Sequence, residues 1–382
     1  MFTPSTASRS RAWLEVDLAA LRANLARLQA AAGPGVGVLP MVKADAYGLG
    51  MAHVATALAR ALAPAGPWGF GVAAVAEGER LRADGWAGRV LVFSPIAPGE
   101  YARAAAAGLT LGLSSHAALE RWRAAAAEAA RRLAFHVEID TGMGRAGLPW
   151  AEAAEWGPAL AAVAADALDW EGCYTHFHSA DEPDLSPTQL QTERFRAAVE
   201  RLPAPAGAPR LLHASNSAAA LRCGSFGLDL VRPGIALYGG LAGPGTQGDA
   251  VVAVRARLAL VRTVQAGATL GYGATYAARR AERWGTVTIG YGDGIPRALA
   301  AAGGEALVRG VRVPIIGRIS MDVLTLALSA LPAVEEGDVV TLIGRDGAAA
   351  ISVDEVARRC GTISYEILTG LTPRLPRVYS GD

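Results

Sequence analysis

Hydrophobic and polar positions along residues 14–245 alternate between short β-like runs and alanine-rich stretches with helical spacing. A first helix is predicted after Asp17, a good N-cap residue that precedes leucines at positions 18, 21, 25 and 28. Eight β-like runs follow, separated by helical segments: VGVLPMVKA, WGFGVAAV, RVLVFSP, LTLGLSS, LAFHVEID, EGCYTHF, RLLHASN and LDLVRPGIALYG. Repeated βα units build parallel sheets, and eight of them predict an α/β fold, a TIM-like (β/α)8 barrel.

The pattern changes after a Gly/Pro-rich linker at residues 239–249. Alternating runs joined by Gly-containing turns then predict a mainly β region, with one short helix expected at Val353–Arg359: VVAVRARLALVRTV, GTVTIGYG, ALVRGVRVPIIGRI, DVLTLAL and GDVVTLIG. We therefore predict a barrel domain at 14–245 and a β-rich C-terminal domain at 246–382, the latter together with residues 1–13. The strand-like stretch Trp13–Val16 could join the sheet of the second domain.

The 382 residues carry a formal net charge of +1 and are 52% hydrophobic, which suits a soluble globular protein long enough for two domains. This balance predicts no binding to nucleic acid or to a membrane surface. Three cysteines, Cys173, Cys223 and Cys360, have no metal or CxxC spacing, so we expect them to be reduced, as in a cytoplasmic protein. The segment MFTPSTASRSRAW has no apolar core, so neither a signal peptide nor a transmembrane helix is expected.

The basic residues divide into 35 arginines and a single lysine, Lys43. A drift from lysine to arginine needs no functional cause, because most surface positions require only a positive charge. A position that keeps lysine is different, because an amine can lose its proton and form a Schiff base, whereas a guanidinium stays protonated. Lys43 is therefore a candidate nucleophile, although composition alone is equally compatible with the chance survival of one lysine.

Barrel enzymes place their chemistry at the carboxyl ends of the strands, and several polar residues are expected there. Lys43 ends the first predicted strand and is followed by a Gly-Leu-Gly segment that would let backbone approach a ligand. The other candidates at strand ends are Asp45, Tyr47, Arg145, His176, His178, His213, Asn216, Ser217, Arg232, Gly234 and Ile235. A lysine surrounded by aromatic, histidine and arginine groups predicts a Schiff-base site.

A phosphate-binding region is also predicted, after the seventh and eighth strands. Ser217 opens the helical segment SAAALR, whose first N–H groups would face an anion, and Gly234 would let the next loop approach closely. A Schiff-base lysine beside a phosphate site points to pyridoxal phosphate, whose ring withdraws electrons from carbanions. Taken alone, Ser217 is better interpreted as an ordinary helix N-cap.

Nine motifs, in order along the chain from Lys43 to Tyr365, resemble those of bacterial alanine racemases, which are fold-type III pyridoxal-phosphate enzymes: VKADAYGLG, HVEIDTGMGRAG, YTHF, NSAAA, VRPGIALYGG, GYGATY, IGYGDG, GRISMD and TISYE. The resemblance implies a barrel followed by a β domain. It also implies a head-to-tail homodimer in which the partner's β domain completes each active site. The implied activity interconverts L-alanine and D-alanine through an external aldimine of pyridoxal 5′-phosphate and supplies D-alanine for peptidoglycan.

The resemblance assigns Lys43 as the residue that holds the coenzyme and as the base for the α-proton of the D-enantiomer. Tyr272, from the partner, would be the second base and would handle the proton of the L-enantiomer. Two bases on opposite faces of a planar carbanion exchange protons without rotating it.

Further roles follow from the same resemblance. Arg232 would contact the pyridine nitrogen, keeping it unprotonated and limiting transamination, and His176 would bridge Arg232 and Tyr272. Phosphate contacts are implied for Tyr47, Ser217, Gly234, Ile235 and Tyr365. Arg145 and the backbone of Met321 would receive the substrate carboxylate. Asp181, Tyr291, Arg297, Asp322 and Ile363 resemble the residues at the entrance of a narrow channel.

One position departs from the family pattern. Family members often carry a lysine, carbamylated by carbon dioxide, seven positions before the arginine that corresponds to Arg145, and this chain has Glu138 there. A carbamylated lysine is impossible at that position. We therefore expect Glu138 to pair directly with Arg145, and activity to be independent of bicarbonate.

Other functions stay open at this point. A non-catalytic pyridoxal-phosphate-binding homeostasis protein would lack the β domain, and a related decarboxylase would present a catalytic cysteine, which Cys360 does not match in position. A metal-dependent barrel hydrolase using His176 and His178 would carry its HxH pair on the first strand, so no metal is expected. A racemase of serine or of broader specificity within the same family is the nearest alternative.

Overall fold

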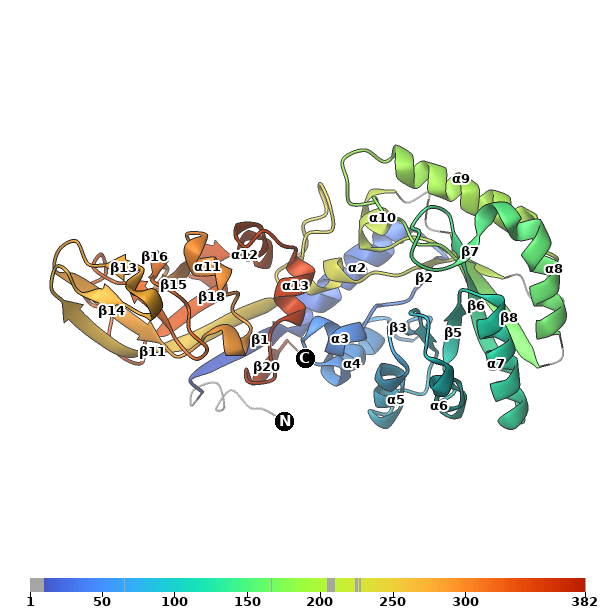
Figure 1. Cartoon of the computed structure of the whole chain (residues 1–382), viewed down its shortest axis with the longest axis horizontal. Helices are drawn as coiled ribbons and strands as arrows, with labels where there is room; N and C mark the ends of the chain where they lie inside the picture. Colours follow the sequence, from blue (N-terminus) through green and yellow to red (C-terminus); the bar gives the residue numbers. More distant parts are fainter. Residues whose placement is uncertain are drawn as a thin grey trace.

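We describe the protein from a computed structural model, which covers residues 10–64, 66–165, 167–204, 210–223, 226 and 228–381. Two domains follow each other along the long axis of the molecule (Figure 1). The barrel lies at the right of the view and the β-rich domain at the left, with β1, α2 and β11 running between them. None of the helices in these ranges has the length and apolar character needed to cross a bilayer.

The first domain is the predicted barrel. Its parallel strands are β2 (Gly37–Val38), β3 (Phe70–Val72), β4 (Val90–Val92), β5 (Thr110–Leu113), β6 (Leu133–Asp140), β8 (Leu168–Tyr174), β9 (Leu211–His213) and β10 (Leu230–Val231). They pair in the order β2-β10-β9-β8-β6-β5-β4-β3, and a parallel bridge between Met41 and Gly71 joins the two edges. The short β7 (Leu148–Pro149) pairs with the end of β6. Each expected β-like run therefore contributes one strand.

Helices alternate with these strands and cover the outside of the barrel (Figure 1). They are α2 (Leu18–Ala32), α4 (Met51–Ala61), α5 (Val75–Ala83), α6 (Tyr101–Ala106), α7 (His116–Glu128), α8 (Ala153–Ala164), α9 (Ser186–Glu200) and α10 (Ser217–Arg222), with shorter turns at α3 (Lys43–Tyr47), η1 (Pro98–Glu100), η2 (Trp150–Glu152) and η4 (Ile235–Tyr238). The predicted start of the first helix is confirmed, because the Asp17 carboxylate accepts the N–H groups of Ala19 and Ala20.

The second domain is mainly β, as predicted. Its elements are β11 (Val252–Val264), β12 (Thr269–Leu270), η5 (Tyr272–Ala274), β13 (Tyr276–Ala277), β14 (Glu282–Val287), η6 (Tyr291–Asp293), α11 (Ala298–Ala301), β15 (Glu305–Val308), β16 (Val311–Ile316), β17 (Leu324–Ala327), β18 (Val339–Asp346), β19 (Ala349–Ile351), α12 (Val353–Arg359), α13 (Ser364–Thr369) and β20 (Arg377–Ser380). The strands pair in the order β19-β18-β15-β16-β17-β14-β11-β1-β20, and β18 also pairs with β11. The helix expected at Val353–Arg359 is α12.

The strand-like stretch near the N-terminus joins the second domain. It lies in β1 (Ala12–Asp17), which pairs antiparallel with β11 and parallel with β20. The expected domain boundary at residue 14 therefore falls inside a strand of the second sheet. Residues 1–9 of the predicted segment 1–13 lie outside the described part of the chain.

The last strand also contacts the loop that follows Lys43. The guanidinium of Arg377 donates to the carbonyl of Gly48 at 2.8 Å, and the Tyr379 hydroxyl donates to the carbonyl of Leu49 at 2.9 Å. A Cβ atom at Gly50 would overlap the Tyr379 hydroxyl. The glycines of this loop therefore allow a close approach to the second domain, and the expected approach to a ligand stays a prediction.

This contact predicts a specific cost for a methyl group at Gly50. Both substitutions strain the backbone, but only at Gly50 does the added methyl group also overlap another side chain. Gly50→Ala should therefore lower the free energy of unfolding by about 1–3 kcal/mol more than Gly33→Ala. The two glycines have nearly the same φ, +97° and +96°, and no atom lies within 4 Å of a Cβ at Gly33. Urea unfolding at one protein concentration measures both variants. Equal losses would contradict the predicted contact with Tyr379.

Candidate active site

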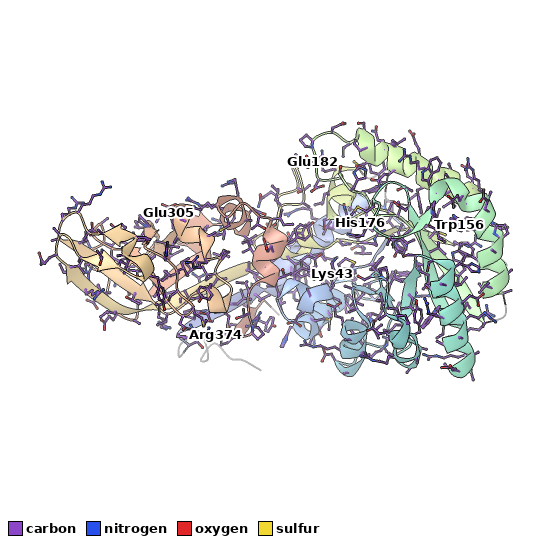
Figure 2. All side chains as sticks on the ribbon, in the orientation of Figure 1. Lys43, Trp156, His176, Glu182, Glu305 and Arg374 are labelled. Atoms are coloured by element: carbon purple, nitrogen blue, oxygen red, sulfur yellow. The ribbon has the colours of Figure 1, made fainter. Side chains whose placement is uncertain are left out.

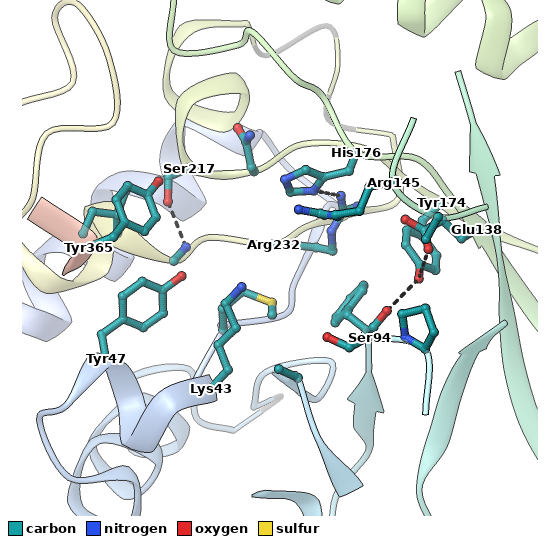
Figure 3. Close-up of a pocket in the computed structure, with 18 residues that line it drawn as sticks. Lys43, Tyr47, Ser94, Glu138, Arg145, Tyr174, His176, Ser217, Arg232 and Tyr365 are labelled. Atoms are coloured by element: carbon teal, nitrogen blue, oxygen red, sulfur yellow. Dashed lines mark hydrogen bonds between the residues drawn. The ribbon is translucent and has the colours of Figure 1, made fainter. Parts of the chain in front are cut away.

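A cavity of about 360 Å³ opens at the carboxyl ends of the barrel strands. That volume lies in the range of small-molecule sites. Its lining includes Met41, Lys43, Tyr47, Ala73, Phe93, Ser94, Pro95, Glu138, Arg145, Ala146, Tyr174, His176, Asn216, Ser217, Arg232, Gly234, Ile235 and Tyr365. Lys43 lies between two groups of side chains in this cavity, with Tyr47 and Tyr365 on one side and Arg145 and Arg232 on the other (Figure 3). Most of the residues singled out from the sequence therefore meet in one place.

Lys43 begins α3, a turn with unusual backbone geometry. Residues 44–47 all have positive φ values, from 52° to 56°, although none of them is glycine. This strained turn is held by a carboxylate, because Glu77 accepts the N–H groups of Ala44 at 2.7 Å and Ala73 at 2.8 Å. Burial and the charge of Arg145 lower the pKa of the Lys43 amine. The lysine is therefore fixed in direction and loses its proton more readily than a lysine in water.

Ser217 lies beside Tyr47 and Tyr365, in the predicted phosphate region (Figure 3). The Ser217 hydroxyl accepts the N–H groups of Gly234 at 2.8 Å and Ala236 at 3.3 Å. The helix cap of α10 is instead Asn216, whose side chain accepts from Ala219 at 3.1 Å. The interpretation of Ser217 as an ordinary N-cap is therefore wrong, because its neighbour fills that position and leaves the hydroxyl directed at the loop after β10.

Two tyrosines enclose this region. The rings of Tyr47 and Tyr365 lie 6.0 Å apart, and the Tyr47 hydroxyl occupies the space that a Cβ atom at Gly234 would take. Burial raises the pKa of Tyr365 to about 12, and it raises the pKa of Tyr47 further. Both hydroxyls stay protonated at neutral pH and can donate hydrogen bonds to an anion.

Arg232 lies on the opposite side of the cavity and is almost fully buried. Its guanidinium donates to the backbone carbonyls of Thr175 at 2.8 Å and Ala214 at 2.9 Å, and it lies 3.4 Å from Nδ1 of His176. Because arginine has no acceptor atom, His176 must accept through Nδ1. Burial and the charge of Arg232 lower the pKa of His176 to about 3, so this imidazole is neutral. The predicted contact between Arg232 and His176 is present.

Glu138 does not pair directly with Arg145, which corrects our expectation. No ion pair within 4 Å joins them in the described ranges, and the Glu138 carboxylate instead accepts from Ser114 at 2.9 Å and Tyr174 at 3.3 Å. Both hydrogen bonds go to the same carboxylate oxygen, Oε2, and hold the Glu138 side chain between Ser114 and Tyr174. Burial raises the pKa of Glu138, while the charge of Arg145 acts in the opposite direction. The charge of Arg145 therefore acts on Glu138 across the cavity without a direct contact.

A second group of predicted residues lies outside the cavity, on the surface of the second domain. Tyr272 is 72% exposed, Met321 is 52% exposed and Tyr291 is 41% exposed. The loops of Tyr291 and Met321 are joined by hydrogen bonds between Tyr291 N and Ser320 O at 3.0 Å and between Gly292 N and Met321 O at 2.9 Å. Arg374 binds Asp322 at 2.6 Å beside them. Arg374 lies in the second domain, away from Lys43 and His176 in the barrel (Figure 2).

Several other candidates have separate roles or positions. Asp45 accepts the N–H of Met51 and faces Arg80, and the His178 ring bonds to Ser179 rather than facing His176. Asp181, Arg297 and Ile363 are exposed. The three cysteines are free, and no group of three metal-binding side chains lies together in the described residues.

Three polar residues of the barrel interior were missed from the sequence: Tyr174, His136 and Glu171. Tyr174 lines the cavity and contacts Glu138, whereas His136 and Glu171 lie deeper in the barrel. A signal was present, because His136 and Glu138 alternate with apolar residues and share one face of β6. Polar side chains at inward positions of a buried strand mark a polar interior.

Comparison with known proteins places the whole chain in one family. Residues 16–242 match the family model for the alanine racemase N-terminal domain, and residues 251–379 match the model for the alanine racemase C-terminal domain. An alanine racemase of Citrifermentans bemidjiense is 39% identical over 380 residues, covering 96% of this chain and 98% of the relative. A catabolic alanine racemase of Mesorhizobium japonicum is 40% identical, covering 99% of this chain and 96% of the relative.

Solved structures agree with the sequence comparison. Alanine racemase from Streptomyces lavendulae superposes with a TM-score of 0.89 at 35% identity, covering 100% of this chain and 98% of that one. Alanine racemase from Bartonella henselae, with covalently bound pyridoxal phosphate, superposes with a TM-score of 0.86 at 29% identity, covering 97% of this chain and 100% of that one.

The cavity fits pyridoxal phosphate. Lys43 supplies an amine, Arg232 supplies a fixed donor on the opposite side, and the hydroxyls of Tyr47, Ser217 and Tyr365 gather where an anion would lie. The close contact of the Tyr47 hydroxyl with Gly234 leaves no room for a side chain at that edge.

Buried histidines predict that the cofactor-free protein loses stability in acid. Burial lowers the pKa values of His136, His176 and His213, so the unfolded chain takes up protons first as the pH falls below 6.5. Each such histidine decreases the free energy of unfolding by up to about 1.4 kcal/mol per pH unit. For His176 this loss extends from pH 6.5 down to about 3. Urea unfolding from pH 4.5 to pH 7.5 should show that the free energy of unfolding depends less steeply on pH for His176→Gln than for the wild type, and an equal dependence would contradict the burial of a neutral imidazole.

Proposed function

The chain belongs to the alanine racemase family, and from this premise we propose which of its residues interconvert L-alanine and D-alanine. The protein is a pyridoxal 5′-phosphate-dependent isomerase. The observation that carries the assignment is the position of Lys43, because the chain's single lysine lies in the same cavity as Arg232 and the tyrosine hydroxyls. When bound, the cofactor withdraws electrons from the α-carbon of alanine and makes its proton removable.

Lys43 is the proposed attachment residue and the base on one face of the substrate. Its lowered pKa leaves more of the amine unprotonated at neutral pH, which favours both bond formation and proton uptake. The strained turn and the two hydrogen bonds to Glu77 keep the amine directed into the cavity. A fixed base needs no reorientation between removing a proton and returning it.

Tyr272 is the proposed base on the other face, and it would come from a second copy of the chain. Its exposure and its distance from the cavity lining of its own subunit support this assignment. Met321 and Tyr291 lie on joined loops of the same domain and would arrive with it. We therefore propose a homodimer in which each cavity is completed by the partner's second domain, burying side chains that are exposed in one chain.

Arg232 is proposed to donate a hydrogen bond to the pyridine nitrogen. Burial lowers the pKa of Arg232 to about 10, so the guanidinium keeps its proton at neutral pH and leaves the ring nitrogen unprotonated. His176, neutral and accepting from Arg232, would present its other ring nitrogen as a donor toward Tyr272 of the partner subunit. That contact would favour the deprotonated, basic form of the tyrosine.

Arg145 and the backbone of Met321 are proposed to receive the substrate carboxylate. Glu138 acts on Arg145 through its charge and contacts Tyr174 directly. Tyr47, Ser217, Gly234, Ile235 and Tyr365 are proposed to hold the phosphate. Tyr291 and Asp322 would border the entrance of the completed site and restrict it to small substrates.

We also propose that the enzyme works in the cytoplasm and supplies D-alanine for peptidoglycan, without binding nucleic acid or membranes. Three free cysteines support a reducing compartment. The two nearest alternatives, a racemase of serine and a non-catalytic carrier of the cofactor, differ from this proposal in which amino acids are turned over.

A mixed dimer tests the shared active site. Lys43→Ala and Tyr272→Phe should each abolish most conversion of L-alanine to D-alanine, because each variant removes one of the two bases. A heterodimer of one chain of each kind, purified with two tags, has one intact site and should recover about half of the wild-type rate. An inactive heterodimer would place both bases in one chain. A wild-type protein that binds the cofactor but racemises nothing would favour the carrier.

Glu138 predicts an enzyme that does not respond to bicarbonate. Removing carbon dioxide and bicarbonate should leave the wild-type rate unchanged, because a carboxylate is built into the chain at this position. Glu138→Gln should raise the KM for alanine about three- to tenfold through Arg145. Glu138→Lys should restore a dependence on bicarbonate. Steady-state racemase assays with and without bicarbonate measure all three proteins, and a bicarbonate-dependent wild type would refute the assignment.

A further inference from the structure

A chain of polar side chains runs from Arg232 into the interior of the barrel. Nη1 of Arg232 lies 2.9 Å from Nδ1 of His213, and Nε2 of His213 lies 2.7 Å from Nδ1 of His136. Nε2 of His136 lies 3.5 Å from Oε2 of Glu171. Both imidazoles are completely buried, and the Glu171 side chain is 21% exposed. The hydrogen-bonded chain therefore leads from the cavity to His136, and the partly solvated carboxylate of Glu171 on β8 lies beside its end.

The donors and acceptors allow only one order of protons along this chain. Arg232 can only donate, so Nδ1 of His213 must accept and the proton of His213 must lie on Nε2. That proton is donated to Nδ1 of His136, which places the proton of His136 on Nε2, facing Glu171. Burial lowers the pKa values of both histidines and keeps them neutral. The order therefore ends at a carboxylate, the group best suited to accept from His136.

At the end of the chain of polar side chains, Nε2 of His136 and Oε2 of Glu171 face each other. Neither Nε2 of His136 nor Oε2 of Glu171 has a hydrogen-bond partner in the described ranges, which leaves each facing the other. The other carboxylate oxygen of Glu171 binds Arg89 at 3.0 Å. Burial acts to raise the pKa of Glu171, but His136 and Arg89 outweigh it and lower the pKa. Glu171 is therefore a stable negative charge at the end of the chain.

The barrel makes room for this chain. A Cβ atom at Gly172 would lie 2.5 Å from Nδ1 of His136 and 2.8 Å from the carbonyl oxygen of Leu211, so only glycine fits there. The interiors of such barrels are normally filled by branched apolar side chains, which would pack here at lower cost than a polar chain. Stability alone does not account for this row of buried polar side chains. At the end that reaches the cavity it contacts Arg232, a proposed functional residue.

We propose that Glu171, His136 and His213 are positioning residues that hold the guanidinium of Arg232 in one orientation. This inference rests on the proposed function, because it assigns a purpose to the orientation of Arg232. A firmly held, fully protonated Arg232 leaves the cofactor ring a weak electron acceptor, which favours racemisation. Loosening the chain should increase transamination, in which hydrolysis releases pyruvate and leaves the amino group on the cofactor.

The first test measures proton positions without the cofactor. The protein has six histidines, and labelling them with ¹⁵N allows solid-state NMR to assign the protonated nitrogen of each ring. We expect neutral His213 and His136 at pH 8, both protonated on Nε2. In Glu171→Gln, the resonances of both rings should shift, although His213 does not contact Glu171. A matched control is Asp169→Asn, which removes the same charge from the same strand and breaks a comparable 2.7 Å ion pair with Arg132.

The second test measures the balance of the two reactions in the loaded enzyme. Pyruvate formed per alanine racemised should rise on the order of three- to tenfold in Glu171→Gln and stay at the wild-type value in Asp169→Asn. Arg89→Gln, which leaves Glu171 and both histidines in place, should change this ratio less than Glu171→Gln.

Specific results would overturn the proposal. A proton on Nδ1 of His213, or a charged imidazole in the chain at pH 8, would refute the order directly in wild-type protein. If Glu171→Gln and Asp169→Asn gave the same histidine resonances and the same ratio of pyruvate to racemised alanine, Glu171, His136 and His213 would have no positioning role. A wild-type protein without racemase activity would instead refute the proposed function, and the NMR measurement would still decide whether the chain is ordered.

Discussion

The buried guanidinium of Arg232 is the constraint on which the interior of the barrel depends. A charge taken out of water is tolerated only when its N–H groups have partners, and Arg232 finds them in two backbone carbonyls and the imidazole of His213. Polar atoms therefore extend into β6, β8 and β9, where a barrel of this kind is normally apolar. Glycines at 112 and 172 supply the space for the rings of Tyr174 and His136. The buried charge of Arg232 thus constrains the polar side chains on these three strands.

The fold could be predicted largely because its signals are local. Each barrel strand overlaps one short β-like run, and the start of α2 is marked by Asp17 and the spacing of its leucines. The pairing of β1 with β20 could not be predicted, because it joins residues more than 350 positions apart. Local pattern shows that Trp13–Val16 is a strand and leaves its partner open. Long-range pairing depends on the packing of both domains.

The candidate site was predictable to a different degree for each residue. Lys43 could be found from composition, since no other lysine is present. The partners of Glu138 could not, because Ser114 and Tyr174 approach it from neighbouring strands and leave Arg145 without a direct contact. Tyr272 was identified only by resemblance, because an exposed tyrosine in a turn carries no local sign of chemistry. The position of His136 on the face of Glu138 was a signal, but its neighbour Glu171 could not be predicted, because it reaches His136 from a different strand, β8.

The contacts of β20 give the enzyme an order of assembly. The carbonyl groups that follow the Lys43 turn are bound by Arg377 and Tyr379, which leave the ribosome after every barrel strand and after the rest of the second sheet. During synthesis, the turn that positions Lys43 therefore lacks these two partners until β20 has been made. The amine of Lys43 reaches its final setting only in a chain that carries both domains, which ties the appearance of a working site to the formation of the second sheet.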